Sequence, residues 1–178
     1  SPYSYLASTQ LADLPGAFTW RPFDVLELMK RVGNAPTSVT CKPKQAYARQ
    51  DLARWAGLYG VGLSPNPGMG GIDGRRLLHA ALAAETHGKG EEASLRLFAA
   101  MWAGDAPLAT SDDLSALLAD LGVTPSLVDA PERAAELEAN TAAAVEAGVF
   151  GAPSFLTEGG LLFFGNDRLD FLRRALAA

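Results

Sequence analysis

The first four residues, Ser1-Pro2-Tyr3-Ser4, place a hydroxyl at the start of an expected helix. Serine is favoured at a helix N-cap, and proline is favoured at the first helical position. The amides of a first turn lack partners within the helix, and the helix dipole favours negative charge there. A thiolate is stabilised at such a place. Because the chain has serine there, Ser1 could stabilise only a thiolate that a ligand brings; an ordinary N-cap explains the same residues.

A second group of candidate residues lies near the other end of the chain. The segment Val149-Phe150-Gly151-Ala152-Pro153-Ser154-Phe155 predicts a strand with a bend at Pro153, because proline cannot donate to a sheet ladder. In the following Asn166-Asp167-Arg168, Asp167 stands where the N-cap of a final helix is expected. Asp167 could instead meet a ligand ammonium, and Arg168 a carboxylate, as the end of an α-amino acid requires. The sequence leaves both interpretations open.

Two weaker signals lie between these groups. Gly33-Asn34-Ala35-Pro36 predicts a turn in which Asn34 could hydrogen-bond a peptide-like ligand. Lys44 begins a predicted helix, where a cation is unfavourable, and this hints at an anionic partner, although a solvated lysine is the simpler interpretation. Arg75 and Arg76 beside a glycine-rich loop could receive a substrate carboxylate or lie on a solvated helix face.

The few residues with redox or metal-binding chemistry exclude some classes of protein. Cys41 is the single cysteine, so an internal disulfide and a Cys-x-x-Cys dithiol enzyme are both excluded. We interpret Cys41 as incidental, and one cysteine is consistent with a reducing, cytoplasmic compartment. His79 and His87 lack ligand-like spacing with acidic residues, and we therefore predict no metal site.

Composition narrows the class further. A chain of 178 residues predicts one domain, or one domain with a large insertion. Its net charge of −5 argues against nucleic-acid binding, which needs clustered basic residues. No apolar run approaches the roughly 20 residues of a membrane span, and no signal-peptide pattern is present.

The expected elements are helices over most of the chain and strands at its two ends. A strand is expected over 17–23, and a hairpin over 149–164 with Gly159-Gly160 as its turn. The expected helices cover 1–14, 24–32, 44–59, 75–87, 91–102, 111–121, 131–148 and 167–177. The chain begins directly with a helix, and we expect an upstream strand that precedes Ser1.

Taken together, these motifs resemble a known family. The order Ser1-Pro2-Tyr3-Ser4-Tyr5-Leu6-Ala7, Gly33-Asn34, Val149 to Pro153 and Gly165 to Leu169 is similar to 2-hydroxychromene-2-carboxylate isomerases and, more distantly, to kappa-class glutathione transferases. The resemblance covers nearly the whole chain, and residues 51–60 favour the isomerases. It implies an α/β fold, a DsbA-like thioredoxin-like domain of 1–41 plus 139–178 with a large all-helical insertion of 42–138.

The resemblance also implies a function and a site. It implies a glutathione-dependent isomerase of aromatic degradation intermediates, cytoplasmic and homodimeric, whose substrate is a small aromatic carboxylate. In the family, Ser1 would be the catalytic serine that faces the glutathione sulfur. The positions that would bind the glutathione cofactor are Asn34, Lys44, Ala152 and Pro153 of the cis-proline loop, and Asp167 and Arg168 at the γ-glutamyl end. A kappa-like glutathione transferase and a non-catalytic thioredoxin-like binding module are the alternatives.

Overall fold

The computed structural model describes residues 1–177, without the side chains of Ser38 and Val39. The chain forms two compact units. Unit 1 consists of Ser1–Phe18, Val25–Leu63 and the chain from Ala143 onward, and unit 2 consists of Thr19–Asp24 and Ser64–Ala142. The predicted helical insertion begins at residue 42, whereas the helix that starts there belongs to unit 1. The predicted domain boundaries stay a prediction.

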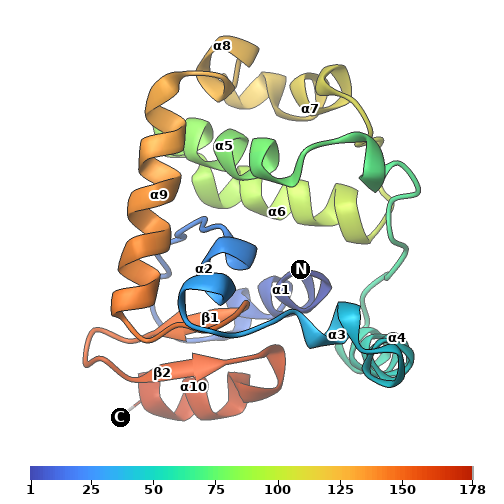
Figure 1. Ribbon diagram of the computed structural model, residues 1–178, viewed down its shortest axis with the longest axis vertical. Coiled ribbons are helices and arrows are strands. Elements are labelled where there is room, and N and C mark those ends of the chain that lie inside the picture. Colours follow the sequence, from blue (N-terminus) through green and yellow to red (C-terminus); the bar gives the residue numbers. More distant parts are fainter. Residues whose placement is uncertain (178) are drawn as a thin grey trace. The chain divides into compact units, whose positions relative to one another are not determined.

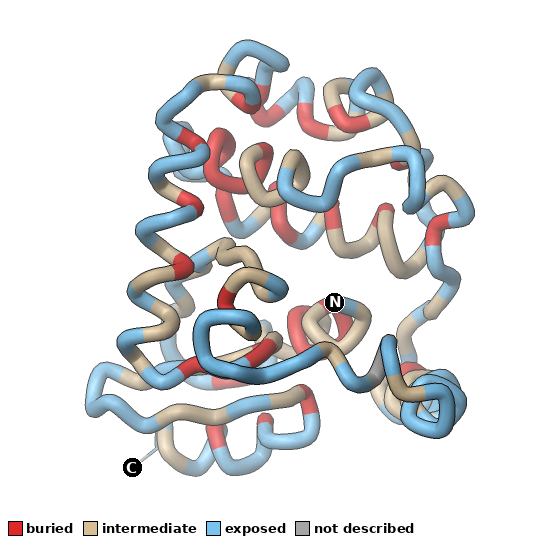
Figure 2. Tube along the Cα trace, viewed as in Figure 1, coloured by how far each residue is buried: buried red, intermediate tan, exposed pale blue. Residues whose placement is uncertain are grey.

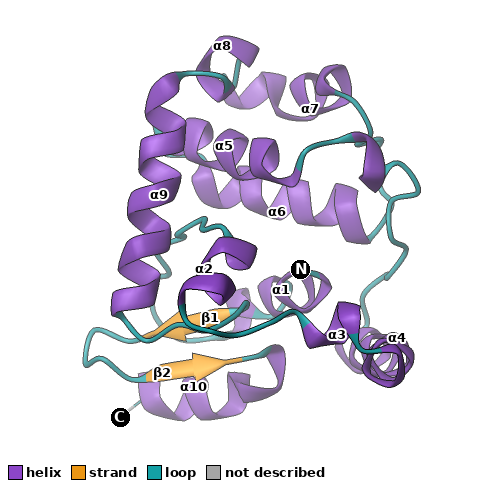
Figure 3. Cartoon of the chain, viewed as in Figure 1, coloured by secondary structure: helices purple, strands orange, loops and turns teal. Residues whose placement is uncertain are grey.

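Unit 1 combines several short helices and the long helix α4 with one hairpin (Figures 1 and 3). Its elements are α1 (Pro2–Ser8), η1 (Leu11–Asp13), α2 (Val25–Arg31), α3 (Thr37–Thr40), α4 (Lys42–Tyr59), β1 (Ser154–Leu156), β2 (Leu162–Phe164), η4 (Asn166–Arg168) and α10 (Leu169–Leu176). Unit 2 is helical in its described elements: η2 (Met69–Gly71), α5 (Gly74–Glu85), α6 (Gly90–Trp102), α7 (Ser111–Leu118), η3 (Ala119–Leu121), α8 (Pro125–Val128) and most of α9 (Pro131–Glu146).

The hairpin is antiparallel, and its register pairs Phe155 directly with Phe163. Because side chains alternate between the faces of a strand, these two rings share one face. They pack there against Leu169 and Leu172 of α10, which form a core with Leu14. The hairpin turn predicted at Gly159-Gly160 is confirmed, since the Thr157 N–H donates to the Leu161 carbonyl at 3.0 Å across it.

The core of unit 2 is built largely from alanine and leucine. Ala80, Ala83 and Ala84 of α5 pack against Ala93 and Ala100 of α6, and all five are fully buried. Their small side chains let the two helices approach closely (Figure 2). The helical interpretation of this part of the sequence is confirmed, with ends shifted by a few residues.

The predicted strand over 17–23 is wrong. Within residues 1–177 the structure contains only the strands β1 and β2. The segment Thr19–Asp24 instead bonds to side chains of α9: Asn140 donates to the Pro22 carbonyl at 3.0 Å, and the Asp24 N–H donates to Thr141 Oγ1 at 3.0 Å. Pro22 has no N–H to give to a ladder. Side-chain partners therefore replace the strand pairing that alternation alone suggests.

The first predicted helix is shorter than expected. It ends at Ser8, whose hydroxyl donates to the Tyr5 carbonyl at 2.7 Å, and Thr9 bonds the Leu6 carbonyl at 2.8 Å. Hydroxyls that bond nearby backbone groups compete with helix propagation. A turn and η1 follow where the sequence predicted a continuous helix to residue 14.

The structure can be searched for membrane-spanning helices and for metal-binding groups. Among residues 1–177, no helix combines the length and the apolar character that crossing a membrane requires. In the same part of the chain, no three histidine, cysteine or acidic side chains gather in a group that could hold a metal ion.

We predict that His79 of α5 makes stability depend on pH. Burial lowers the pKa of His79 from its usual value, and the neighbouring Arg75 and Arg133 act in the same direction against the weaker opposing charges of Asp73 and Asp129. Its Nε2 is buried without a hydrogen-bond partner. The unfolded chain binds this proton near pH 6.5, so stability is complete above about pH 6.5 and falls as the pH decreases towards the folded pKa.

Urea unfolding of the wild type and of His79→Gln between neutral and mildly acidic pH measures this effect. The wild type should lose more stability on acidification than the variant. His87→Gln, at an exposed histidine, is the matched control and should follow the wild type. Parallel pH profiles for the wild type and His79→Gln would contradict the assignment.

Candidate functional site

The start of α1 presents the Ser1 hydroxyl at an exposed helix N-cap. Ser1 Oγ accepts the Ser4 N–H at 3.3 Å, Pro2 occupies the first helical position, and the Ser1 carbonyl accepts the Tyr5 N–H at 3.1 Å. The predicted N-cap is confirmed. Because the Ser1 oxygen acts as acceptor in this bond, its O–H remains a donor for a group outside the helix.

The bend at Ala152-Pro153 has a cis peptide bond, as the family resemblance implies. Pro153 is buried, and its carbonyl accepts the Gly165 N–H at 3.0 Å. Within residues 1–177, neither the N–H nor the C=O of half-buried Ala152 has a hydrogen-bond partner. Buried backbone groups are almost always paired, so the N–H and the C=O of Ala152 are left available for an extended, peptide-like ligand.

The turn after β2 corrects the interpretation of Asp167 as a helix cap. Gly165 precedes η4, and neither η4 nor α10 has a side-chain cap. The Asp167 carboxylate instead lies over Gly165, where a Cβ would meet its Oδ1 at 2.5 Å. Its Oδ2 pairs with Arg168 at 2.5 Å, and both side chains remain largely exposed. The Asp167 carboxylate therefore does not cap the amides at the start of the helix.

Packing brings the candidate groups of unit 1 into one neighbourhood. Helix α1, which begins after Ser1, packs against both α4 and η4. The hydrogen bond from Gly165 to Pro153 joins the turn that leads into η4 to the cis-proline bend. These two contacts, between α1 and η4 and between Gly165 and Pro153, link three segments that are distant in sequence: Ser1, Ala152-Pro153 and Asp167-Arg168.

Asn34 and Lys44 bond to other parts of unit 1. Asn34 Nδ2 donates to the Phe150 carbonyl at 2.8 Å, and its Oδ1 accepts the Ala35 N–H at 2.8 Å. Asn34 thus supports the segment that leads into the bend. Lys44 is exposed on α4 and donates to Thr37 Oγ1 at 3.1 Å. A ligand contact for either residue stays a prediction.

A group of tyrosines around α4 was not predicted from the sequence. The Tyr3 hydroxyl donates to Asp51 Oδ2 at 3.0 Å, and Tyr47 contacts the other oxygen at 3.5 Å. Burial raises the pKa of Tyr3, and the hydrogen bond and charge of Asp51, the Tyr47 phenol and the charge of Asp167 raise it further. Tyr3 therefore stays protonated between two acidic residues. The spacing of Tyr47 and Asp51 by one helical turn was the available signal.

Tyr59, at the end of α4, bonds to the first residue of η4. Its hydroxyl donates to the Asn166 carbonyl at 3.0 Å, and the Asn166 side chain donates back at 3.5 Å. Asn166 is only 3% exposed, so the bond lies in a shielded place. Burial raises the pKa of Tyr59, as do the charges of Asp167 and Asp170, although the bond to Asn166 opposes the shift.

Arg75, Arg76 and Cys41 take no part in this neighbourhood. Arg75 pairs with Asp24 at 3.6 Å and Arg76 with Asp129 at 2.8 Å, all within unit 2. Structural ion pairs thus account for both arginines. Cys41 is half-buried at the start of α4 and makes no side-chain cap.

The chain is similar to known proteins in both sequence and fold. The DSBA-like thioredoxin domain family matches residues 1–177. A solved structure of 2-hydroxychromene-2-carboxylate isomerase (HCCA isomerase) has a TM-score of 0.85 and 27% identity, over 99% of this chain and 90% of that one. The fold and the cis-proline bend thus define a DsbA-like thioredoxin fold, and the predicted fold class is confirmed.

Curated relatives narrow the class. The 2-hydroxychromene-2-carboxylate isomerase of Sphingobium xenophagum is 30% identical over 185 residues, which cover 99% of this chain and 93% of the relative. The enzyme of the same name from Pseudomonas putida is 30% identical over 189 residues, with 99% and 89% covered. The chain belongs to the 2-hydroxychromene-2-carboxylate isomerase family within the DSBA-like thioredoxin group, and its enzyme class is isomerase.

We predict that Tyr3→Phe destabilises the protein, because it removes a hydrogen bond to the Asp51 carboxylate in a partly buried place. Hydrogen bonds to charged groups contribute about 1.5–3 kcal/mol, so a loss near the lower end of that range is expected. Urea unfolding measures it. Tyr47→Phe removes a hydroxyl at the longer distance of 3.5 Å from an exposed ring and is the matched control, with a smaller loss. Equal effects of the two substitutions would contradict the importance of Tyr3.

Proposed function

We propose that this chain is a glutathione-dependent isomerase of the 2-hydroxychromene-2-carboxylate type, which acts on aromatic degradation intermediates. The observation that carries the proposal is the pair of unpaired backbone groups of Ala152, joined through Pro153 and Gly165 to the exposed Asp167-Arg168 pair. A γ-glutamyl tripeptide has a backbone amide next to its thiol and both an ammonium and a carboxylate at one end. The site offers a matching group for each.

The residues of the site match glutathione in their chemistry and in the order in which they would contact it. In the proposal, the Ala152 backbone pairs with the cysteinyl part, Asp167 meets the ammonium, and Arg168 meets the carboxylate of the γ-glutamyl end. For that, the Asp167-Arg168 pair exchanges its mutual contact for contacts with the ligand. Asn34 and Lys44 complete the proposed ligand contacts, Asn34 partly by supporting Phe150 and Lys44 as an exposed cation.

Ser1 holds the reactive sulfur in this proposal. When bound, glutathione supplies a thiolate that adds reversibly to an unsaturated, ring-opened or hemiketal substrate and is expelled after rotation about the former double bond. The Ser1 O–H donates to that sulfur, and the first-turn amides and dipole of α1 favour its negative charge, which lowers the thiol pKa from about 8.5. Serine therefore stabilises the nucleophile and does not attack the substrate itself.

The proposal extends to the setting of the enzyme. We place it in the cytoplasm as a homodimer, with glutathione and a small aromatic carboxylate as partners and without a nucleic-acid partner. The single cysteine and the net charge of −5 support the compartment and the last point respectively. Sedimentation velocity of the full chain tests the homodimer.

We expect Ser1→Ala to slow glutathione-dependent turnover by about 30-fold or more, the equivalent of one hydrogen bond to a charged group. The ultraviolet absorbance of the bound thiolate should decrease in parallel, because the thiol pKa rises. Ser4→Ala removes the same hydroxyl group from the first turn, keeps the backbone N–H that bonds to Ser1 Oγ, and should keep both signals. Wild-type turnover by Ser1→Ala would remove Ser1 from the mechanism.

We expect Asp167→Asn to raise the KM for glutathione about tenfold while kcat changes little, because the lost charge contacts the ligand far from the reacting sulfur. Steady-state kinetics at saturating substrate measure both constants. Asp170→Asn, at an exposed acid one residue into α10, controls for the general loss of negative charge. A lower kcat with an unchanged KM would contradict the assigned contact.

The two alternatives are separated by simple observations. Mass analysis of the product distinguishes an isomerase, whose product has the substrate mass, from a transferase, whose product is a glutathione adduct. A non-catalytic binding module would give no thiolate absorbance on titration with glutathione.

A further inference from the structure

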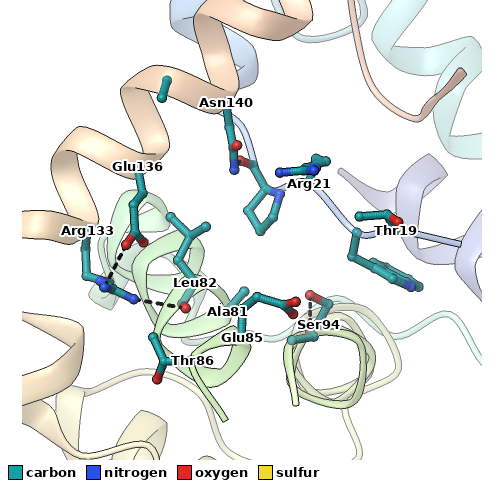
Figure 4. A pocket seen from close by; sticks show the side chains of 14 residues that line it. Thr19, Arg21, Ala81, Leu82, Glu85, Thr86, Ser94, Arg133, Glu136 and Asn140 are labelled. Atoms are coloured by element: carbon teal, nitrogen blue, oxygen red, sulfur yellow. Dashed lines mark hydrogen bonds and ion pairs between the residues drawn. The ribbon is translucent and has the colours of Figure 1, made fainter. Parts of the chain in front are cut away.

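The helical unit contains a cavity of its own. It has a volume of about 380 Å³, and every residue that lines it belongs to unit 2 (Figure 4). The walls come from residues 19–22, from α5 and α6, and from α9. None of the residues proposed to bind glutathione lines it. The volume lies at the small end of the range of ligand sites, so the cavity suits a small molecule.

Four charged residues line the cavity, and two of them neutralise each other. Arg133 is only 8% exposed; its Nη2 pairs with Glu136 at 2.8 Å, and its Nη1 donates to the Leu82 carbonyl at 3.0 Å. Figure 4 shows this pair at one side of the cavity, with Arg133 linked to α5 through Leu82. Because each charge of the pair is compensated, this wall of the cavity carries no net charge.

The other two charged residues, Arg21 and Glu85, have opposite signs and are both exposed. Within residues 1–177, neither side chain forms an ion pair or a hydrogen bond, either with the other or with a third residue. Arg21 belongs to the segment 19–24 and Glu85 is the last residue of α5, and Figure 4 shows them on different walls of the cavity. A ligand that complements both residues must itself carry both charges.

The Glu85 carboxylate lies beside a second acceptor group, at Gly90. One of its oxygens approaches Gly90 so closely that a side chain at this position would collide with it. The buried Ser94 hydroxyl donates to the Gly90 carbonyl at 2.7 Å, so the Ser94 oxygen keeps lone pairs that can accept a hydrogen bond. Two acceptors from different helices therefore lie near the start of α6. An ammonium group, which only donates hydrogen bonds, suits such a place.

Apolar side chains form much of the remaining lining. They come from the segment 19–24, from α5 and from α9, and they are Trp20, Pro22, Ala81, Leu82 and Ala139. An aliphatic group that enters the cavity is removed from water by contact with them, which is favourable. The lining thus offers a cation, a group of acceptors and an apolar surface, which match the three parts of an aliphatic α-amino acid.

We propose that this cavity binds a small aliphatic α-amino acid as its zwitterion. The carboxylate pairs with the Arg21 guanidinium, whose planar shape allows two parallel hydrogen bonds. The ammonium donates to Glu85 and Ser94, and the side chain packs against Leu82. This site shares no residue with the proposed glutathione site, and it is therefore independent of the proposed isomerase activity.

Titration of the isotopically labelled full chain with L-leucine, in the absence of glutathione, tests the proposal. Trp20 lines the cavity, and its indole N–H signal reports on its surroundings by nuclear magnetic resonance. Trp20→Phe identifies this signal among those of the three tryptophans, and Trp55→Phe with Trp102→Phe identifies it by elimination if Trp20→Phe does not fold. The Trp20 signal should shift and saturate as L-leucine is added.

Two analogues of leucine each keep one of its charges. In 4-methylpentanoate the carboxylate and the aliphatic chain remain without the ammonium, and in 3-methylbutylamine the ammonium remains without the carboxylate. Each analogue should bind at least about tenfold more weakly than L-leucine, as the loss of one charge-assisted hydrogen bond implies.

Two substitutions should separate the two ends of the ligand. Arg21→Gln should weaken leucine binding by about tenfold or more and leave the binding of 3-methylbutylamine unchanged, because that amine has no carboxylate for Arg21. Glu85→Gln should weaken leucine binding by a similar factor and leave the binding of 4-methylpentanoate unchanged. Arg49→Gln and Glu91→Gln remove the same charges at exposed positions outside the cavity, and as matched controls they should keep the wild-type affinity.

The proposal is overturned if the Trp20 signal does not respond to L-leucine, if either analogue binds as tightly as L-leucine, or if Arg21→Gln or Glu85→Gln binds leucine like the wild type. Loss of the Trp20 response in Asp167→Asn would also overturn it, because leucine would then act through the charged turn of unit 1. An unchanged Trp20 response in Asp167→Asn supports the cavity as the site. None of these outcomes bears on glutathione binding, because glutathione is absent.

Discussion

The hydrogen bond from the Gly165 N–H to the Pro153 carbonyl, at 3.0 Å, is the contact on which the candidate site depends. It joins the cis-proline bend before β1 to the turn after β2, immediately beyond the last strand pair, Ser154 with Phe164. The same region is closed by the rings of Phe150 and Phe164, whose centroids are 4.6 Å apart. Hairpin pairing therefore brings the unpaired backbone groups of Ala152 and the charged Asp167-Arg168 turn close together.

Side chains from other parts of unit 1 hold this arrangement in place. Asn34 supports the Phe150 carbonyl on one side, and Tyr59 supports the Asn166 carbonyl on the other. Tyr3, through Asp51, fastens the first turn of α1 to α4. Each of these bonds joins two residues that are remote in sequence. Residues that bind a ligand need such support, because a loop without it does not keep a fixed geometry.

The charges around the start of α1 determine what this helix end must do in the proposed function. Burial raises the pKa of Tyr3 most, and the hydrogen bond and charge of Asp51 together with the charge of Asp167 raise it further, so two carboxylates act on the first turn of α1. A thiolate near these carboxylates would be disfavoured by like charge. In the proposed function the Ser1 hydroxyl and the first-turn amides must therefore outweigh that repulsion. Donated hydrogen bonds, rather than a neighbouring cation, are the means that the described residues of α1 provide.

Local signals in the sequence determined most of the secondary structure and the chemical types of the site residues. The Ser1-Pro2 cap, the bend at Pro153 and the Gly159-Gly160 turn follow from backbone chemistry that adjacent residues decide, and the structure contains all three. The tertiary structure alone decided which partner each group takes. It gave the backbone of residues 19–24 to Asn140 and Thr141 instead of a strand. These partners lie 118 and 117 positions further along the chain, so the alternation of residues 17–23 carries no signal of them.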